Sequence, residues 1–257
     1  MVFNVAISRP YPLGTRSAQE QPMRNRLNVL FSLTSLSVVL VTVERFSFTQ
    51  RILLPPHHFL RLHELVQMTV LILLTVVVPA LVLREVTQNF AALRSAAGAR
   101  LFLAFVAGVY FYATGNGVHE MASYALSASC DPDHVTGDRC GALFVNDYYT
   151  GNILYFIGAF LMTASLLLFE RRNPSQAYRR GGLAVLVGNA LVFALTVLAY
   201  AGLDRVLVGL GYSVVTTLFV LACLLPVRRR YRDYPFTTYT AIVYTLGTLA
   251  SIAVRLS

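Results

Sequence analysis

Residues 63–83 read HELVQMTVLILLTVVVPALVL, and this stretch decides the fold. After Glu64 no charged residue follows until Arg84. About 20 apolar residues in a helix cross the hydrocarbon core of a bilayer. A helix is favoured there because it satisfies its own backbone hydrogen bonds without water. The stretch therefore predicts a transmembrane helix that opens with two ionisable residues, His63 and Glu64.

Six further apolar stretches of similar length are present. With the first, the predicted spans are 27–47, 63–83, 101–125, 147–169, 182–201, 206–226 and 237–255. The connection 202–205 is so short that the fifth and sixth helices should form an antiparallel hairpin. We predict an all-α, polytopic integral membrane protein with seven transmembrane helices in a single domain, 27–257. Residues 1–26 are expected to form a mostly disordered cytoplasmic tail.

The composition supports a membrane protein and argues against other classes. Hydrophobic residues make up 56% of the chain and charged residues 13%, whereas about a quarter of a soluble domain is charged. The formal charge of +9 comes from short basic clusters between the spans. Since a nucleic-acid-binding protein carries its basic residues on a solvated face, we expect no nucleic acid partner. All 21 basic residues are Arg, so a lysine Schiff base to retinal or pyridoxal phosphate is excluded.

The arginines also predict the orientation in the membrane. With the N-terminus in the cytoplasm, 15 arginines fall on the inner side and six on the outer side. Cytoplasmic segments carry the excess of basic residues. We therefore expect a cytoplasmic N-terminus and an extracytoplasmic C-terminus, in a multi-pass protein of the bacterial inner (plasma) membrane.

The outer side contains one larger loop, 126–146, with two of the three cysteines. A disulfide between Cys130 and Cys140 is expected if the loop faces an oxidising compartment, and two unpaired thiols are the alternative. Such a bond would hold the loop over the helix ends. Cys223 lies within an apolar stretch and is expected to be a small buried hydrophobic residue.

A second asymmetry follows from the orientation. All five histidines and eight of the twelve acids fall on the outer side. In the third span, polar residues recur at the spacing of one helical face, and the fourth span opens with a similar series. Polar faces within a membrane must meet protein or water, and ionisable residues there suggest function. We predict an outward-opening cavity between the second, third and fourth helices.

These residues support a hypothesis of metal-dependent chemistry. Two histidines and a carboxylate bind zinc in many hydrolases and leave a position open for water. The predicted metal ligands are His63, His119 and Asp147, and the predicted catalytic carboxylates are Glu64 and Glu120. Predicted substrate contacts are Tyr112, Asn116, Tyr148 and Asn152.

The favoured function is thus a membrane-embedded hydrolase or lipid-modifying enzyme that uses a divalent metal (Zn or Fe). Its partners would be membrane lipids and a lipidic or small-molecule substrate. One alternative is a haem b protein with His63 and His119 as axial ligands. Others are a non-catalytic subunit of a membrane complex and a transporter. The spans contain no charged residue at mid-depth and the sequence shows no repeat, which disfavours ion-coupled transport.

Overall fold

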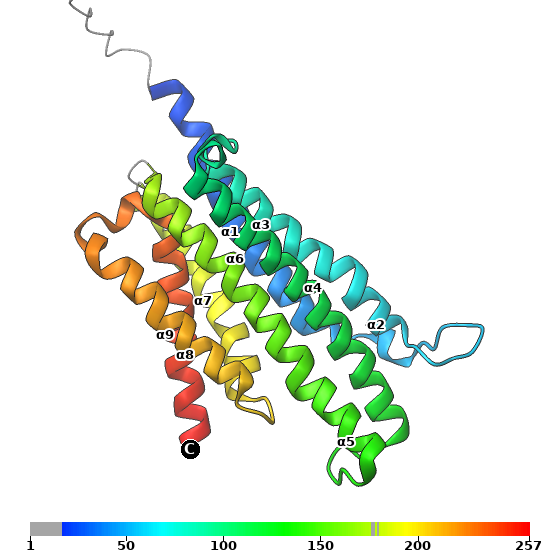
Figure 1. The fold of residues 1–257 in the computed structure, drawn as a ribbon. Coiled ribbons are helices and arrows are strands. Elements are labelled where there is room, and N and C mark those ends of the chain that lie inside the picture. Colours follow the sequence, from blue (N-terminus) through cyan, green and yellow to red (C-terminus); the bar gives the residue numbers. More distant parts are fainter. Residues whose placement is uncertain (1–16, 176–177, 179) are drawn as a thin grey trace, which may run out of the picture.

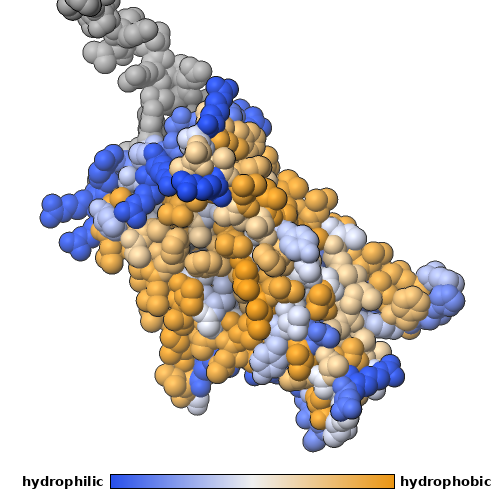
Figure 2. Space-filling view, viewed as in Figure 1, coloured by the Kyte–Doolittle hydropathy of each residue, from blue (hydrophilic) through white to orange (hydrophobic). Residues whose placement is uncertain are grey.

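The computed structural model describes residues 17–175, 178 and 180–257 as a bundle of long helices (Figure 1). Seven helical segments are long and apolar enough to cross a membrane, as the sequence predicted. They are Arg26–Arg51, Leu62–Val86, Ala96–Ser129, Gly137–Arg172, Gly181–Gly202, Val208–Asp233 and Pro235–Leu256. Apolar residues cover the middle of the bundle and hydrophilic residues gather at its two ends (Figure 2). The architecture is that expected of a multi-pass membrane protein.

Several spans are built from more than one element. The first half of the described chain forms α1 (Ser17–Glu44), η1 (Phe48–Arg51), α2 (Leu62–Val66), η2 (Gln67–Leu71), α3 (Ile72–Val86), η3 (Ala91–Arg94) and α4 (Ala96–Ser129). The second half forms α5 (Gly137–Val145), η4 (Asn146–Gly151), α6 (Asn152–Arg172), α7 (Arg180–Gly202), α8 (Val208–Leu224), η5 (Leu225–Asp233) and α9 (Pro235–Leu256). Both η2 and η4 are π-helical turns inside otherwise continuous helices.

The two ends of the bundle differ in the segments that they carry. The α5 end is defined here by residues 45–61, 130–146 and 203–207, and the opposite end by residues 87–95 and 225–234. Helix α1 begins at the opposite end, whereas α9 finishes at the α5 end (Figure 1). An odd number of spans places the two ends of the described chain on different sides.

Helices α4 and α6 form the closest pair in the bundle. Gly115 lies at their contact, where an added Cβ atom would come within 2.2 Å of the backbone nitrogen of Tyr155. Small residues let two membrane helices approach backbone to backbone. This close contact at Gly115 brings the polar face of α4 against the start of α6. Elsewhere α9 packs against both α7 and α8, which themselves contact each other as the short connection 203–207 requires.

Two boundaries differ from the sequence prediction. Helix α1 reaches back to Ser17, so residues 17–25, assigned to the tail, extend the helix that forms the first span; residues 1–16 lie outside the described residues. The predicted loop 126–146 is largely helical, because α4 continues to Ser129 and α5 begins at Gly137. Ala, Leu, Met and Gln favour helix, and a helix readily extends beyond the hydrocarbon. The predicted disulfide between Cys130 and Cys140 is confirmed and ties the end of α4 to α5.

At the opposite end a buried carboxylate joins two helices. Glu170 of α6 has 0% exposure, and it accepts hydrogen bonds from the backbone nitrogens of Phe236 (2.8 Å) and Thr237 (2.7 Å). The Thr237 hydroxyl also donates to it, at 2.7 Å. These two N–H groups belong to the first turn of α9, where no acceptor within the helix is available. A carboxylate is also favoured at a helix N-terminus. Glu170 therefore caps α9 from a neighbouring helix.

Candidate functional site

Ionisable side chains from four segments meet at the α5 end. We call them the polar cluster: Glu44, Arg45, Arg61, His63, Glu64, His119, Glu120 and Asp147. Four are almost fully buried, namely His63 (5% exposed), Glu64 (0%), Glu120 (3%) and Asp147 (4%). Buried charges require partners, and the cluster supplies them in three groups. Of the residues that the sequence singled out, His63, Glu120 and Asp147 are buried and His119 is partly buried.

The first group is built around His63. Its Nδ1 atom forms a close ion pair with Glu44, and its Nε2 atom lies 3.7 Å from the Glu120 carboxylate. Gln67 donates to Glu44 at 3.2 Å, and the Thr49 hydroxyl donates to the same carboxylate. His63 is thus placed between two carboxylates. Glu44, near the end of the predicted first span, thus belongs to the polar cluster.

The second group fixes the tautomer of His119. Its Nδ1 atom lies 3.0 Å from the backbone oxygen of Asp147 and 2.8 Å from Oδ1 of the same residue. Since both oxygens are acceptors, Nδ1 carries the proton. Its Nε2 atom lies 2.9 Å from Nη2 of Arg45, which can only donate. In this tautomer the Nε2 lone pair of His119 is directed at Arg45.

The third group uses Glu64 at the start of α2. Arg61 donates to Glu64 through its backbone nitrogen (3.1 Å), Nε (2.8 Å) and Nη2. Both carboxylate oxygens are occupied, so Glu64 closes a capping interaction with the helix that contains it. Glu64 is paired with Arg61 and does not line the cavity described below, whereas Glu120 does. A catalytic role for Glu64 stays a prediction.

A cavity of about 230 Å³ opens next to the first two groups. It is lined by Arg45, Gln50, Arg61, His63, His119, Glu120, Ser123 and Ser127. Asp147 lies behind His119, on the side of the ring away from Arg45. Every side chain in the lining is polar, and three of them were predicted site residues. The sequence treated Arg45 and Arg61 only as orientation signals, and nothing in their local context marks them as cavity residues.

Both π-helical turns border this cluster. Turn η2 starts at Gln67, one helical turn after His63, and η4 contains Asp147. π-Helical turns occur mainly as single turns within α-helices and often at functional sites. Gly151, the last residue of η4, sits so close to α4 that an added Cβ atom would lie 2.8 Å from Cα of His119. The glycine allows η4 to bring Asp147 to the histidine.

The four predicted substrate contacts lie near the cluster but do not line the cavity. The hydroxyls of Tyr112 and Tyr155 are hydrogen bonded at 2.9 Å. Asn116 is buried with no hydrogen-bond partner for Nδ2 among the described residues. The side chain of Asn152 donates to the backbone oxygen of Tyr148 at 3.1 Å. A substrate role for Tyr112, Asn116, Tyr148 and Asn152 stays a prediction, best supported for Asn116.

The remaining outer-side histidines lie apart from the cluster. His57 and His58 are exposed in the loop between η1 and α2. His134 is exposed and pairs with Asp131 at 3.1 Å. The backbone N–H of Asp133 and the His134 side chain lower the pKa of the Asp131 carboxyl. Arg205 contacts Asp133 at 2.8 Å and thereby holds the loop 130–136 against the loop 203–207.

The arrangement does not fit a bound metal or haem as it stands. Among residues 17–175, 178 and 180–257, no group of three or more His, Cys, Asp or Glu side chains could hold a metal ion. Both ring nitrogens of His119 already contact protein atoms, so ligation of Zn, Fe or a haem by that ring requires Arg45 or Asp147 to leave. The metal ligands His63, His119 and Asp147 and the haem b alternative stay predictions of the sequence.

Comparisons of the chain with protein-family models, with curated proteins and with solved structures gave no match.

Proposed function

We propose that the chain is a multi-pass membrane enzyme, a hydrolase or lipid-modifying enzyme, with its active site at the cavity beside His119. The observation that carries the proposal is the Asp147–His119–Arg45 series next to Glu120. A neutral histidine with an unprotonated Nε2 atom is suited to act as a general base. A carboxylate behind the ring holds it in that tautomer and stabilises the imidazolium that forms after proton uptake.

Arg45 gives this base a way to respond to substrate. Its guanidinium occupies the Nε2 lone pair of His119 in the structure. A substrate with an anionic or carbonyl oxygen would attract the guanidinium and free the lone pair. Glu120, which lines the same cavity, is the carboxylate placed to exchange a proton with the substrate. The divalent metal (Zn or Fe) expected from the sequence stays a prediction, and the metal content of the purified protein tests it.

We also propose that the cavity opens on the extracytoplasmic side, with the N-terminus in the cytoplasm, in the bacterial inner membrane. The 15-to-six distribution of arginines supports this orientation. The Cys130–Cys140 disulfide lies at the same end as the cavity, and disulfides persist in oxidising compartments. In this orientation the site would meet lipid headgroups or small molecules of the outer side.

The test uses vesicles made from a total lipid extract of bacterial membranes. Purified protein is incubated in these vesicles and the lipids are analysed by mass spectrometry, with His119→Gln as the inactive variant and exposed His134→Gln as the matched control. We expect wild type and His134→Gln to change one lipid class, and His119→Gln to be slower by about 100-fold or more. An unchanged extract, or an equal rate for His119→Gln, would exclude lipid modification at this site.

A further inference from the structure

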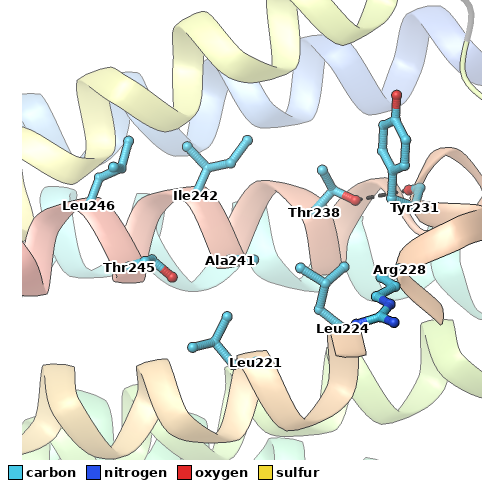
Figure 3. A pocket seen from close by; sticks show the side chains of 9 residues that line it. All are labelled: Leu221, Leu224, Arg228, Tyr231, Thr238, Ala241, Ile242, Thr245 and Leu246. Atoms are coloured by element: carbon cyan, nitrogen blue, oxygen red, sulfur yellow. Dashed lines mark hydrogen bonds between the residues drawn. The ribbon is translucent and has the colours of Figure 1, made fainter. Parts of the chain in front are cut away.

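A second hollow lies at the other end of the bundle, between α8 and α9. It encloses about 450 Å³, within the range of about 300–1,000 Å³ typical of sites for one small ligand. Figure 3 shows Leu221 and Leu224 of α8 facing α9, with Arg228 and Tyr231 at one end. Along α9 the wall continues through Ala241 and Ile242. The groove is thus mostly apolar, with one cationic side chain, Arg228, at one end.

Arg228 is the one charged side chain among the described residues that line the groove. The Thr238 hydroxyl donates to the backbone oxygen of Tyr231 at 2.8 Å, so it is already satisfied. Arg230 is paired with Asp233 at 2.8 Å. By contrast, Arg228 is exposed and has no ion-pair partner within the described part of the chain. An occupant must therefore combine an apolar body with an anionic end near Arg228.

We propose that this groove binds an anionic phospholipid, with one acyl chain between α8 and α9 and the headgroup phosphate on Arg228. The groove follows two helices that are long and apolar enough to span a membrane, so its length lies along the direction of an acyl chain. Arginine matches phosphate oxygens through paired N–H donors. Basic groups at the membrane surface attract anionic lipids. This inference does not depend on the proposed enzyme activity.

The experiment measures lipid binding to the purified protein by native mass spectrometry. Phosphatidylglycerol and phosphatidylcholine with identical acyl chains are titrated separately, and glycerol phosphate is the headgroup-only probe. Arg228→Gln removes the proposed phosphate contact, whereas Arg229→Gln removes the same charge from an exposed neighbour that does not line the groove. Thr245→Phe fills the groove without changing the charge.

We expect wild type and Arg229→Gln to prefer phosphatidylglycerol. Arg228→Gln should weaken its binding about fivefold, the equivalent of about 1 kcal/mol for one basic residue, and Thr245→Phe should weaken both lipids. Equal affinity of wild type for the two lipids would overturn the proposal, as would equal losses in the two arginine variants. Unchanged binding by Thr245→Phe would place the acyl chain elsewhere. If Thr245→Phe instead changed the oligomeric state of the protein, the groove would hold a second copy of this chain and not a lipid.

Discussion

Nδ1 of His119, on α4, lies 2.8 Å from Oδ1 of Asp147, in the π-helical turn η4. The contact joins the two most closely packed helices and leaves Nε2 of the histidine at the cavity. Because the Asp147 carboxylate would stabilise the imidazolium formed when His119 takes up a proton, its removal is the most direct way to test the proposed base.

Asp147→Asn should slow turnover while leaving the residues that line the cavity unchanged. The backbone oxygen at position 147 still accepts from Nδ1, but the amide removes the negative charge that would stabilise the imidazolium formed on proton uptake. We expect a loss of about 100-fold or more in the lipid assay and a decrease of about 1–3 kcal/mol in the free energy of unfolding. Thermal unfolding in detergent measures the second effect. The exposed Asp138→Asn is the control, and equal behaviour of the two variants would contradict the assigned role.

Glu170→Ala should destabilise the protein without affecting the cavity. The substitution leaves the N–H groups of Phe236 and Thr237 buried without an acceptor, which we expect to reduce the free energy of unfolding by about 1–3 kcal/mol. Glu170→Gln keeps one oxygen acceptor and should recover part of that loss. Chemical unfolding of the three proteins in the same detergent tests the order. Equal stability of the two variants would show that the carboxylate is not the cap.

Gly115→Ala and Gly117→Ala form a matched pair, two residues apart on α4. The first methyl group would meet the backbone of α6 at 2.2 Å, whereas nothing lies within 4 Å of the second. We expect Gly115→Ala to lower the unfolding temperature, because two backbones must separate. Gly117→Ala should be neutral or stabilising by up to about 1 kcal/mol, since alanine is the better helix former. A neutral Gly115→Ala would contradict the close α4–α6 contact.

Asp204→Asn should stabilise the protein at neutral pH. Partial burial raises the pKa of the Asp204 carboxyl above its ordinary value of 3.8. A raised pKa in the folded state means that the ionised carboxylate disfavours folding. The cost is present above the folded-state pKa and disappears as the pH falls below the unfolded-state value. The gain in unfolding temperature from Asp204→Asn should therefore be found at pH 7 and be absent near pH 3.5. A gain that does not depend on pH would indicate another cause.

The proposed orientation predicts the reactivity of the cysteines in intact cells. Cys130 and Cys140 should resist a membrane-impermeant maleimide until a mild reductant is added, and then react from the outside. Cys223 is buried and unpaired and should remain unlabelled under both conditions. A Cys223→Ser variant confines the signal to the disulfide pair. Labelling only after the cells are opened would reverse the assigned topology.

Much of the fold follows from local sequence. Each span is recognisable because a bilayer requires about 20 apolar residues in one run, and residues 63–83 show this without reference to any other part of the chain. Helical spacing on the third span singled out His119 and Glu120, which line the cavity, together with Asn116, which does not. It was harder to derive which side chains of the fourth span point toward the polar cluster. The π-helical turn η4 interrupts the regular period between Asp147 and Asn152, so helical spacing does not give their directions.

The sequence by itself determined that the chain forms seven apolar helices, and it indicated which end collects the histidines and which cysteines could pair. Only the tertiary structure decided the partner of each charge. Arg45 meets His119, Glu44 meets His63, and Glu170 caps α9. A hydropathy pattern is read from residues that are adjacent in the sequence. The pairing of buried charges depends instead on which helices pack together. The packing in turn depends on close contacts such as that of Gly115 with α6, which no local pattern specifies.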